Sequence, residues 1–164
     1  MALRAWARTC CDGLTWLTQK VVVALAAVML LAIGWQIAMR YLLNRPPSWT
    51  EELALLCFTW SSLLMLAMGV RHAFHARMDL LVNRLPVRLA RTIEVLVQLG
   101  VAFFGAYLAF GGWAYVAETL TSFSAAIAYP IYLLHAAAPV CGALVSCFAL
   151  ERLLIGPASE GPLA

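Results

Sequence analysis

The residues best suited to redox or cofactor chemistry in this 164-residue chain are three histidines and five cysteines. His72 and His75 are three residues apart and would share one face of a helix, so they could ligate a haem iron together with His135. His135, however, precedes Arg152 by 17 residues, about 25 Å along a helix, whereas His72 and His75 would lie at the same end as Arg152. We therefore expect no bound cofactor and expect His135 to be a packed, neutral side chain.

The five thiols are not spaced for catalysis or metal binding. They are Cys10, Cys11, Cys57, Cys141 and Cys147. None forms a CxxC pair, and the expected outer loops, 44–50 and 118–126, contain no cysteine at all. A disulfide-exchanging membrane enzyme needs paired thiols in such loops. The sequence therefore predicts unpaired thiols, no metal site and no enzyme.

The adjacent carboxylates Glu51 and Glu52 are the most distinctive polar feature. Ser48 precedes Glu51 by three residues, a spacing typical of a capped helix N-terminus, where carboxylates are also stabilised by the helix dipole. We expect the two glutamates to begin a helix and to pair with Arg40 or Arg45 across a turn. A contact with a partner protein or with lipid headgroups is the alternative.

Four uncharged stretches must position these side chains. All eleven Lys and Arg and all eight Asp and Glu lie outside them, in a chain that is 64% hydrophobic and 12% charged. About 20 apolar residues cross the roughly 30 Å of bilayer hydrocarbon. The sequence therefore predicts an all-α integral membrane protein, one membrane domain over residues 1–164. The expected transmembrane helices are at about 20–43, 50–73, 91–117 and 127–153.

The distribution of basic residues predicts the orientation. Nine of the eleven lie in the N-terminal segment, in residues 71–94 and at the C-terminus, and two lie in the first loop. Because cytoplasmic loops carry the excess of Lys and Arg, both termini should be cytoplasmic. The net charge of +3 is spread over these flanks without a basic stripe, which argues against a nucleic-acid partner.

The connections predict two hairpins. Pro46 and Pro47 end the first span in a tight turn, and the polar segment 118–126 makes a second turn on the same side. Residues 76–86 mix apolar and charged side chains, as expected for a short amphipathic helix on the inner leaflet. Arg91 and Glu94 are spaced for a local ion pair, and Pro139 should kink the last span.

Small residues four positions apart predict close helix packing. The pairs are Gly105 and Ala109, Ala102 and Ala106, Ala138 and Gly142, and Gly142 and Ser146. Such spacing lets helix backbones approach in lipid. Packing within one bundle is the simplest interpretation, and a face that docks another membrane subunit would show the same pattern.

Several of these features together carry a family resemblance. The run Ser48-Trp49-Thr50-Glu51-Glu52, the aromatic span with Phe58 and Trp60, Gly69, and His75-Ala76-Arg77-Met78-Asp79 before Leu85-Pro86 follow one another in order. This order resembles the small, DctQ-like membrane subunit of tripartite ATP-independent periplasmic (TRAP) transporters. The similarity covers about residues 14–154, and Ala76 departs from the bulkier aliphatic residue common in the family.

The resemblance implies a non-catalytic role in the bacterial or archaeal cytoplasmic (inner) membrane. In that family a large membrane subunit holds the substrate and sodium sites and moves as an elevator, while a soluble periplasmic substrate-binding protein delivers an organic anion such as a carboxylate. This chain would be the lipid-embedded scaffold, or stator, with no substrate, metal or cofactor site of its own. Its shape and subunit contacts would depend on Trp49, Glu51 and Glu52 at the outer hairpin and on His75, Arg77 and Asp79 in the inner loop.

Two other classes of protein remain open. An independent small transporter, working as a homo-oligomer, would need polar side chains inside the membrane, and the candidates are Gln36, Gln98 and His135. A cofactor-binding membrane protein would show a visible absorption spectrum. Neither alternative accounts for the ordered motifs around residues 48–52 and 75–86.

Overall fold

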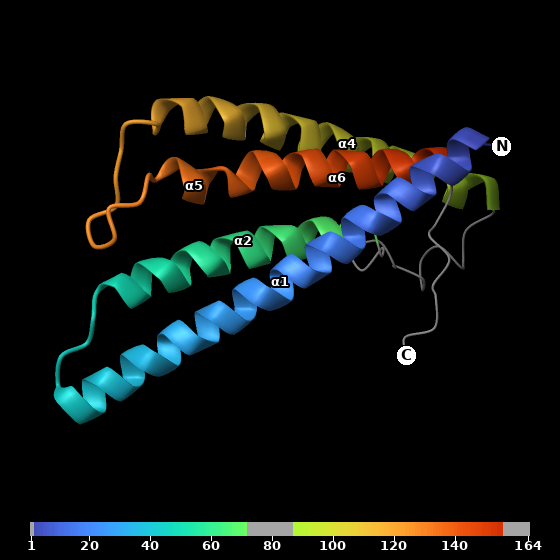
Figure 1. Ribbon diagram of the computed structural model, residues 1–164. Helices are drawn as coiled ribbons and strands as arrows, with labels where there is room; N and C mark the ends of the chain where they lie inside the picture. The colour runs from blue at the N-terminus through green and yellow to red at the C-terminus, as the bar shows by residue number, and fades with distance from the viewer. Residues whose placement is uncertain (1, 72–86, 156–164) are drawn as a thin grey trace.

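The computed structural model describes residues 2–71 and 87–155, which form an all-helical bundle (Figure 1). The helices are α1 (Ala2–Leu43), α2 (Trp49–Arg71), α4 (Val87–Glu118), α5 (Tyr132–His135) and α6 (Ala137–Ile155). Four helical segments are long and apolar enough to cross a membrane, at Arg8–Leu43, Trp49–Arg71, Arg91–Glu118 and Tyr132–Leu153. The predicted all-α class with four spans is confirmed. The expected surface helix at 76–86 lies outside the described residues.

The first hairpin consists of α1 and α2. Helix α1 ends where Asn44 adopts a left-handed conformation (φ 51°), which asparagine tolerates better than most residues. Pro46 and Pro47 follow and cannot continue the helix. Helix α2 then starts at Trp49 and runs back along α1 (Figure 1). Helix α1 begins at Ala2, well before the expected start of the first span at about residue 20.

The second hairpin consists of α4 and the α5–α6 pair. Its connection is folded by backbone hydrogen bonds from Ser124 N–H to the Tyr129 carbonyl and from Ile131 N–H to the Ser122 carbonyl, each 2.9 Å. The returning span is interrupted at Ala136, between α5 and α6, one turn before Pro139. Proline lacks the N–H that would bond to the carbonyl of His135, so one helical hydrogen bond is lost there. Ala136 nevertheless keeps a right-handed helical conformation (φ −60°, ψ −19°), and α5 and α6 together form one span.

Small residues let α4 and α6 approach closely. A methyl group added to Gly142 would lie 2.5 Å from both the Ala109 nitrogen and the Gly105 oxygen. Ser146 fills the adjacent contact, where its hydroxyl donates to the Ala102 carbonyl at 3.2 Å. The spacing of small residues therefore does mediate packing within the bundle, as its simplest interpretation predicts.

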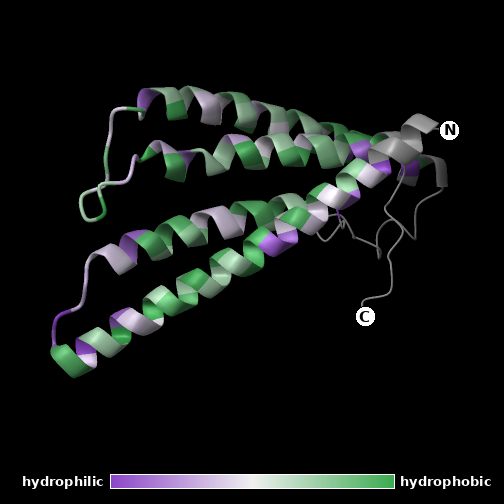
Figure 2. Cartoon of the chain, viewed as in Figure 1, coloured by the Kyte–Doolittle hydropathy of each residue, from purple (hydrophilic) through white to green (hydrophobic). Residues whose placement is uncertain are grey.

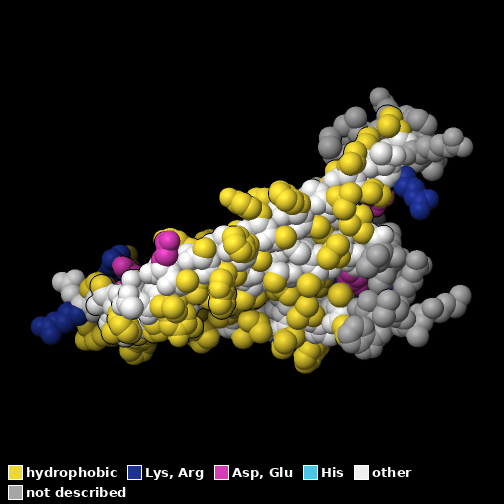
Figure 3. Space-filling view, turned by 90° about the horizontal axis from the view of Figure 1, so that it is seen from above, with side chains coloured by type: hydrophobic (Ala, Val, Ile, Leu, Met, Phe, Trp, Pro, Cys, Tyr) yellow, Lys and Arg dark blue, Asp and Glu magenta, His cyan; other side chains and the backbone are white. Residues whose placement is uncertain are grey.

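The buried core lies where α2 meets α6. Its centre is formed by Ala67, Cys141, Val145 and Phe148. Outside this core the surface is strongly apolar. Hydrophobic residues cover the long helices and polar residues gather at their ends (Figure 2). The face seen from the α4 side shows the same division between an apolar middle and charged ends (Figure 3). This distribution matches a protein whose surrounding solvent is lipid.

Candidate functional site

Glu52 connects the start of α2 to the α4–α5 loop. Its carboxylate accepts hydrogen bonds from the Ser124 hydroxyl and, at 3.0 Å each, from the backbone N–H groups of Ala126 and Ile127. We call these four residues the Glu52 cluster. A charged acceptor with three donors is a strong polar contact. The cluster therefore joins the two hairpins at the end of the bundle where both turns lie.

Tyr129 of the same loop lies near the Glu52 cluster. Partial burial and the nearby Glu52 carboxylate raise the pKa of its phenol above the usual value. The ring therefore stays neutral at physiological pH and adds no charge beside the carboxylate.

The neighbouring Glu51 has a different partner. Its carboxylate accepts a hydrogen bond of 2.7 Å from the Gln36 amide of α1. In the described part of the chain no ion pair joins Glu51 or Glu52 to Arg40 or Arg45, so the predicted pairing across the turn is wrong. Glu51 bonds instead to the amide on α1, and Glu52 bonds to the donors of the α4–α5 loop. Trp49 is the first residue of α2, in the same helical turn as Glu51 and Glu52, and it is 42% exposed.

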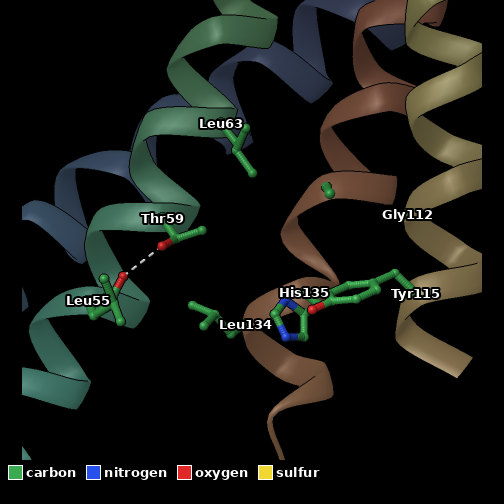
Figure 4. A pocket seen from close by; sticks show the side chains of 8 residues that line it. Leu55, Thr59, Leu63, Gly112, Tyr115, Leu134 and His135 are labelled. Atoms are coloured by element: carbon green, nitrogen blue, oxygen red, sulfur yellow. Dashed lines mark hydrogen bonds between the residues drawn. The ribbon is translucent and has the colours of Figure 1, made fainter. Parts of the chain in front are cut away.

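A second contact between the hairpins involves Trp60. Its indole N–H donates to the Leu133 carbonyl of α5 at 2.9 Å. An open apolar cleft of about 340 Å³ lies between α2 on one side and α4, α5 and the start of α6 on the other (Figure 4). Leu55, Thr59 and Leu63 line one side, and His135 packs edge-on against Tyr115 on the other, with ring centroids 4.5 Å apart. His135 is therefore in aromatic contact, and the cleft offers few polar groups.

Arg71 organises the opposite end of the bundle. Its guanidinium pairs with Glu151 of α6, through Nε and Oε2 at 3.2 Å, and also contacts Asp12 and Thr15 of α1. We call these four residues the Arg71 cluster. Arg71 and Glu151 are buried, with side chains 5% and 7% exposed. The Phe148 ring lies 5.6 Å from the guanidinium carbon, close enough for a cation–π contact. Three helices are thus joined by one buried cation.

Arg152 adds a weaker contact beside this cluster. Its guanidinium donates to the Val70 carbonyl at 3.2 Å and lies 3.9 Å from the Glu94 carboxylate. The predicted local pair between Arg91 and Glu94 is therefore wrong, because α6 supplies the cation that faces Glu94. Helix α4 is thus linked to α6 at this end by a longer and more exposed ion pair than the one between α2 and α6.

Sequence reasoning missed the Arg71 cluster as a unit. Arg71 and Arg152 were counted only as basic flanks of spans. A signal was present, since Arg71 and Glu151 each follow directly on an uncharged stretch, and in an up-and-down bundle the second and fourth spans end on the same side. Among the predicted site residues, His75, Arg77 and Asp79 lie outside the described residues. Trp49, Glu51 and Glu52 lie together at the opposite end.

The polar contacts described here hold the helices of this chain to one another. In the described spans, Asp, Glu, Lys and Arg lie toward the helix ends, and the middle of each span carries none. Charged groups that form a transport path inside a membrane usually lie in the bundle interior. The fold therefore defines a multi-pass membrane protein, built from two hairpins that are joined at both ends.

Comparison with known proteins gives the family. The profile described as "Tripartite ATP-independent periplasmic transporters, DctQ component" matches residues 29–156, and the chain belongs to this family. It is thus a small permease subunit of a TRAP transporter. The match covers about the last third of α1 and all of α2, α4, α5 and α6. The resemblance seen in the ordered motifs is confirmed.

The relatives with curated names are small permease proteins. The sialic acid TRAP transporter small permease protein SiaQ of Vibrio cholerae is 35% identical over 86 residues, 49% of this chain and 50% of SiaQ. The C4-dicarboxylate TRAP transporter small permease protein DctQ of Rhodobacter capsulatus is 31% identical over 118 residues, 70% of this chain and 51% of that protein. The chain therefore spans about half the length of these two relatives.

Proposed function

We propose that this chain is the fixed, non-catalytic scaffold against which the large TRAP membrane subunit moves as an elevator during ion-gradient-driven uptake of an organic anion. Family membership makes a large membrane subunit and a periplasmic substrate-binding protein its expected partners. The names of the relatives, for sialic acid and C4-dicarboxylates, favour a carboxylate as the transported compound. Substrate and sodium would bind to the large subunit, and this chain would hold neither.

The observation that carries the proposal is that the two hairpins are joined at both ends. The Arg71 cluster joins α1, α2 and α6 at one end, and the Glu52 cluster joins α2 to the α4–α5 loop at the other. Motion of one hairpin relative to the other would break either the buried Arg71–Glu151 pair or the three hydrogen bonds to Glu52. Such a bundle suits a part that stays still while another subunit slides along it.

The proposed orientation places the Arg71 cluster at the cytoplasmic side. Lys20 lies 5.8 Å from the Trp16 ring near this end, and basic and aromatic side chains of this kind favour a membrane interface. The Glu52 cluster would then face the periplasm, where the substrate-binding protein docks. Glu51, Glu52 and Trp49 would support the outer hairpin, and the inner-loop residues His75, Arg77 and Asp79 would support the cytoplasmic side.

Co-purification tests the proposal. The chain is tagged at its C-terminus, extracted from its native membrane in mild detergent, and its partners are identified by mass spectrometry. Recovery of a large multi-span TRAP subunit is expected. A stable homo-oligomer without that subunit would contradict the proposal and would make Gln36, Gln98 and His135 the residues to test for an independent transporter.

The scaffold role itself is tested by distances within the assembled complex. Spin labels placed at exposed positions on α1 and α4 report whether the two hairpins move relative to each other. We expect the same distance distribution with and without sodium and substrate, because the end clusters hold the hairpins together. A distance that changes on substrate addition would exclude a fixed scaffold.

A further inference from the structure

Helix α4 presents a face to the outside that is unusual for contact with lipid tails alone. Turned away from α6, this face carries the aromatic side chains of Phe103, Tyr107 and Phe110, all largely exposed. Gly100 and Gly111 are three helical turns apart on the same face, and a methyl group added at either would meet nothing within 4 Å. We call this surface the Tyr107 face.

The hydroxyl of Tyr107 is the informative group on this face. Counting along the span from Arg91 to Glu118, Tyr107 lies about 24 Å from one end and about 16 Å from the other, close to the bilayer centre. Its side chain is 69% exposed, and in the described part of the chain no hydrogen bond involves its hydroxyl. Hydrocarbon supplies no acceptor, so an unpaired hydroxyl there is unfavourable.

Short hydroxyl side chains in the spans differ, because they can donate to carbonyls of their own helix. Thr59 and Ser146 donate to carbonyls four residues earlier in their own helices, at 2.9 Å each. A phenol is too long to bond its own helix in this way. Tyr41 is exposed as well, but it lies at the end of α1, where a tyrosine hydroxyl reaches the interfacial water. Tyr107 therefore stands alone among these hydroxyls in needing an acceptor from another molecule.

The outward face of α1 provides the contrast. Leu31 is 74% exposed there and lies near the middle of the apolar stretch. Trp35, one turn further along the same face, is also exposed, but it lies only about 7.5 Å before Arg40, where an indole N–H reaches the membrane interface. Position 31 itself is purely apolar, and lipid tails satisfy it. The unpaired Tyr107 hydroxyl near the bilayer centre thus distinguishes α4 from α1 and marks α4 as the helix that meets another protein.

We propose that the Tyr107 face docks a transmembrane helix of the large TRAP subunit, with the Tyr107 hydroxyl donating to a carbonyl or side-chain oxygen of that helix. This inference rests on the proposed function, which supplies the partner. The two glycines allow a close approach of the backbones, and the aromatic rings beside them provide contact area. Because the hydroxyl needs an acceptor, the occupant is a protein helix and not a lipid tail.

Site-specific photocrosslinking tests this assignment in native membranes that contain the large subunit. A photoreactive phenylalanine analogue is placed at position 107 in one sample and at position 31 in another. We expect a covalent adduct with the large subunit, identified by mass spectrometry, from position 107 and not from position 31. An adduct from position 31 alone, an adduct between two copies of this chain, or adducts with lipid alone at position 107 would overturn the inference.

A conservative substitution tests the hydrogen bond. Tyr107→Phe should reduce the large subunit recovered with the tagged chain by about three- to tenfold, the range of one interhelical hydrogen bond in a membrane. Tyr41→Phe removes a hydroxyl at the span end and should leave recovery unchanged. The thermal stability of the isolated chain should be the same in both variants, since neither hydroxyl bonds to any residue in 2–71 or 87–155. Equal recovery for Tyr107→Phe and wild type would refute the proposed bond.

The two proposals fail in different ways. If wild-type chain recovers no large subunit, the scaffold function fails. If the large subunit is recovered but position 107 gives no adduct with it, the scaffold function stands and the Tyr107 face is not its docking surface.

Discussion

The guanidinium of Arg71 on α2 lies against the carboxylate of Glu151 on α6, with 3.2 Å between Nε and Oε2, although 80 residues separate them in the chain. Both side chains are almost completely buried. Asp12 also contacts the guanidinium, but its own side chain is 70% exposed. Glu151 is therefore the buried partner of Arg71, and the contact between α2 and α6 depends on it.

Glu151→Gln should destabilise the bundle by about 3 kcal/mol, because removing one charge of a buried pair leaves the other uncompensated. The value lies at the lower end for such pairs because Asp12 still faces Arg71. Thermal unfolding of the purified chain in mild detergent, followed by tryptophan fluorescence, measures the change. A double variant, Arg71→Met with Glu151→Leu, removes both buried charges and should regain most of the loss. An unchanged unfolding temperature for Glu151→Gln would show that the pair adds nothing.

Gly142→Ala should separate α4 from α6. The added methyl group would meet backbone atoms of Ala109 and Gly105 at 2.5 Å, and backbone cannot move aside as a flexible side chain can. We expect a loss of about 1–3 kcal/mol, as for other overpacked sites. Gly34→Ala on α1 is the matched control, since nothing lies within 4 Å of it and alanine favours a helix. Equal effects of the two substitutions would contradict the close packing.

Glu52→Gln should loosen the α4–α5 loop more than Glu51→Gln does. Glu52 accepts three bonds from residues 124–127, whereas Glu51 accepts one from Gln36. Hydrogen exchange of the amides of Ala126 and Ile127 measures the difference, with faster exchange expected only for Glu52→Gln. The double substitution should also reduce assembly with the large subunit and leave the ligand affinity of the soluble binding protein unchanged. Equal amide exchange in the two single variants would argue against the Glu52 cluster.

Trp60→Phe should weaken the contact between α2 and α5 by about 1 kcal/mol, the usual contribution of one hydrogen bond. The phenyl ring keeps most of the packing but cannot donate to the Leu133 carbonyl. Thermal unfolding in detergent measures the loss. Trp113→Phe, at an exposed position of α4, should lower the stability of the bundle by less. A larger loss for Trp113→Phe would indicate that the indole bond is unimportant.

Much of the architecture could be predicted from local patterns in the sequence. Uncharged stretches of about 20 residues must cross the membrane as helices, since lipid leaves no other way to satisfy the backbone. Pro46 and Pro47 predicted the first turn, and the four-residue spacing of Gly105 with Ala109 and of Ala138 with Gly142 predicted close helix packing, although not which helices meet. These features depend on neighbouring residues or on periodicity within one helix, which a single sequence displays directly.

The partners of the charged residues were decided only by the tertiary structure. From the sequence, Glu52 was expected to pair with a nearby arginine, and it bonds instead to a loop more than 70 residues away. Glu94 likewise faces Arg152 of α6. Spacing along one helix shows which side chains share a face, but the tilt and relative height of two helices decide which faces meet. The sequence alone therefore determined the spans, the turns and the family, and the three-dimensional packing determined how the two hairpins are joined.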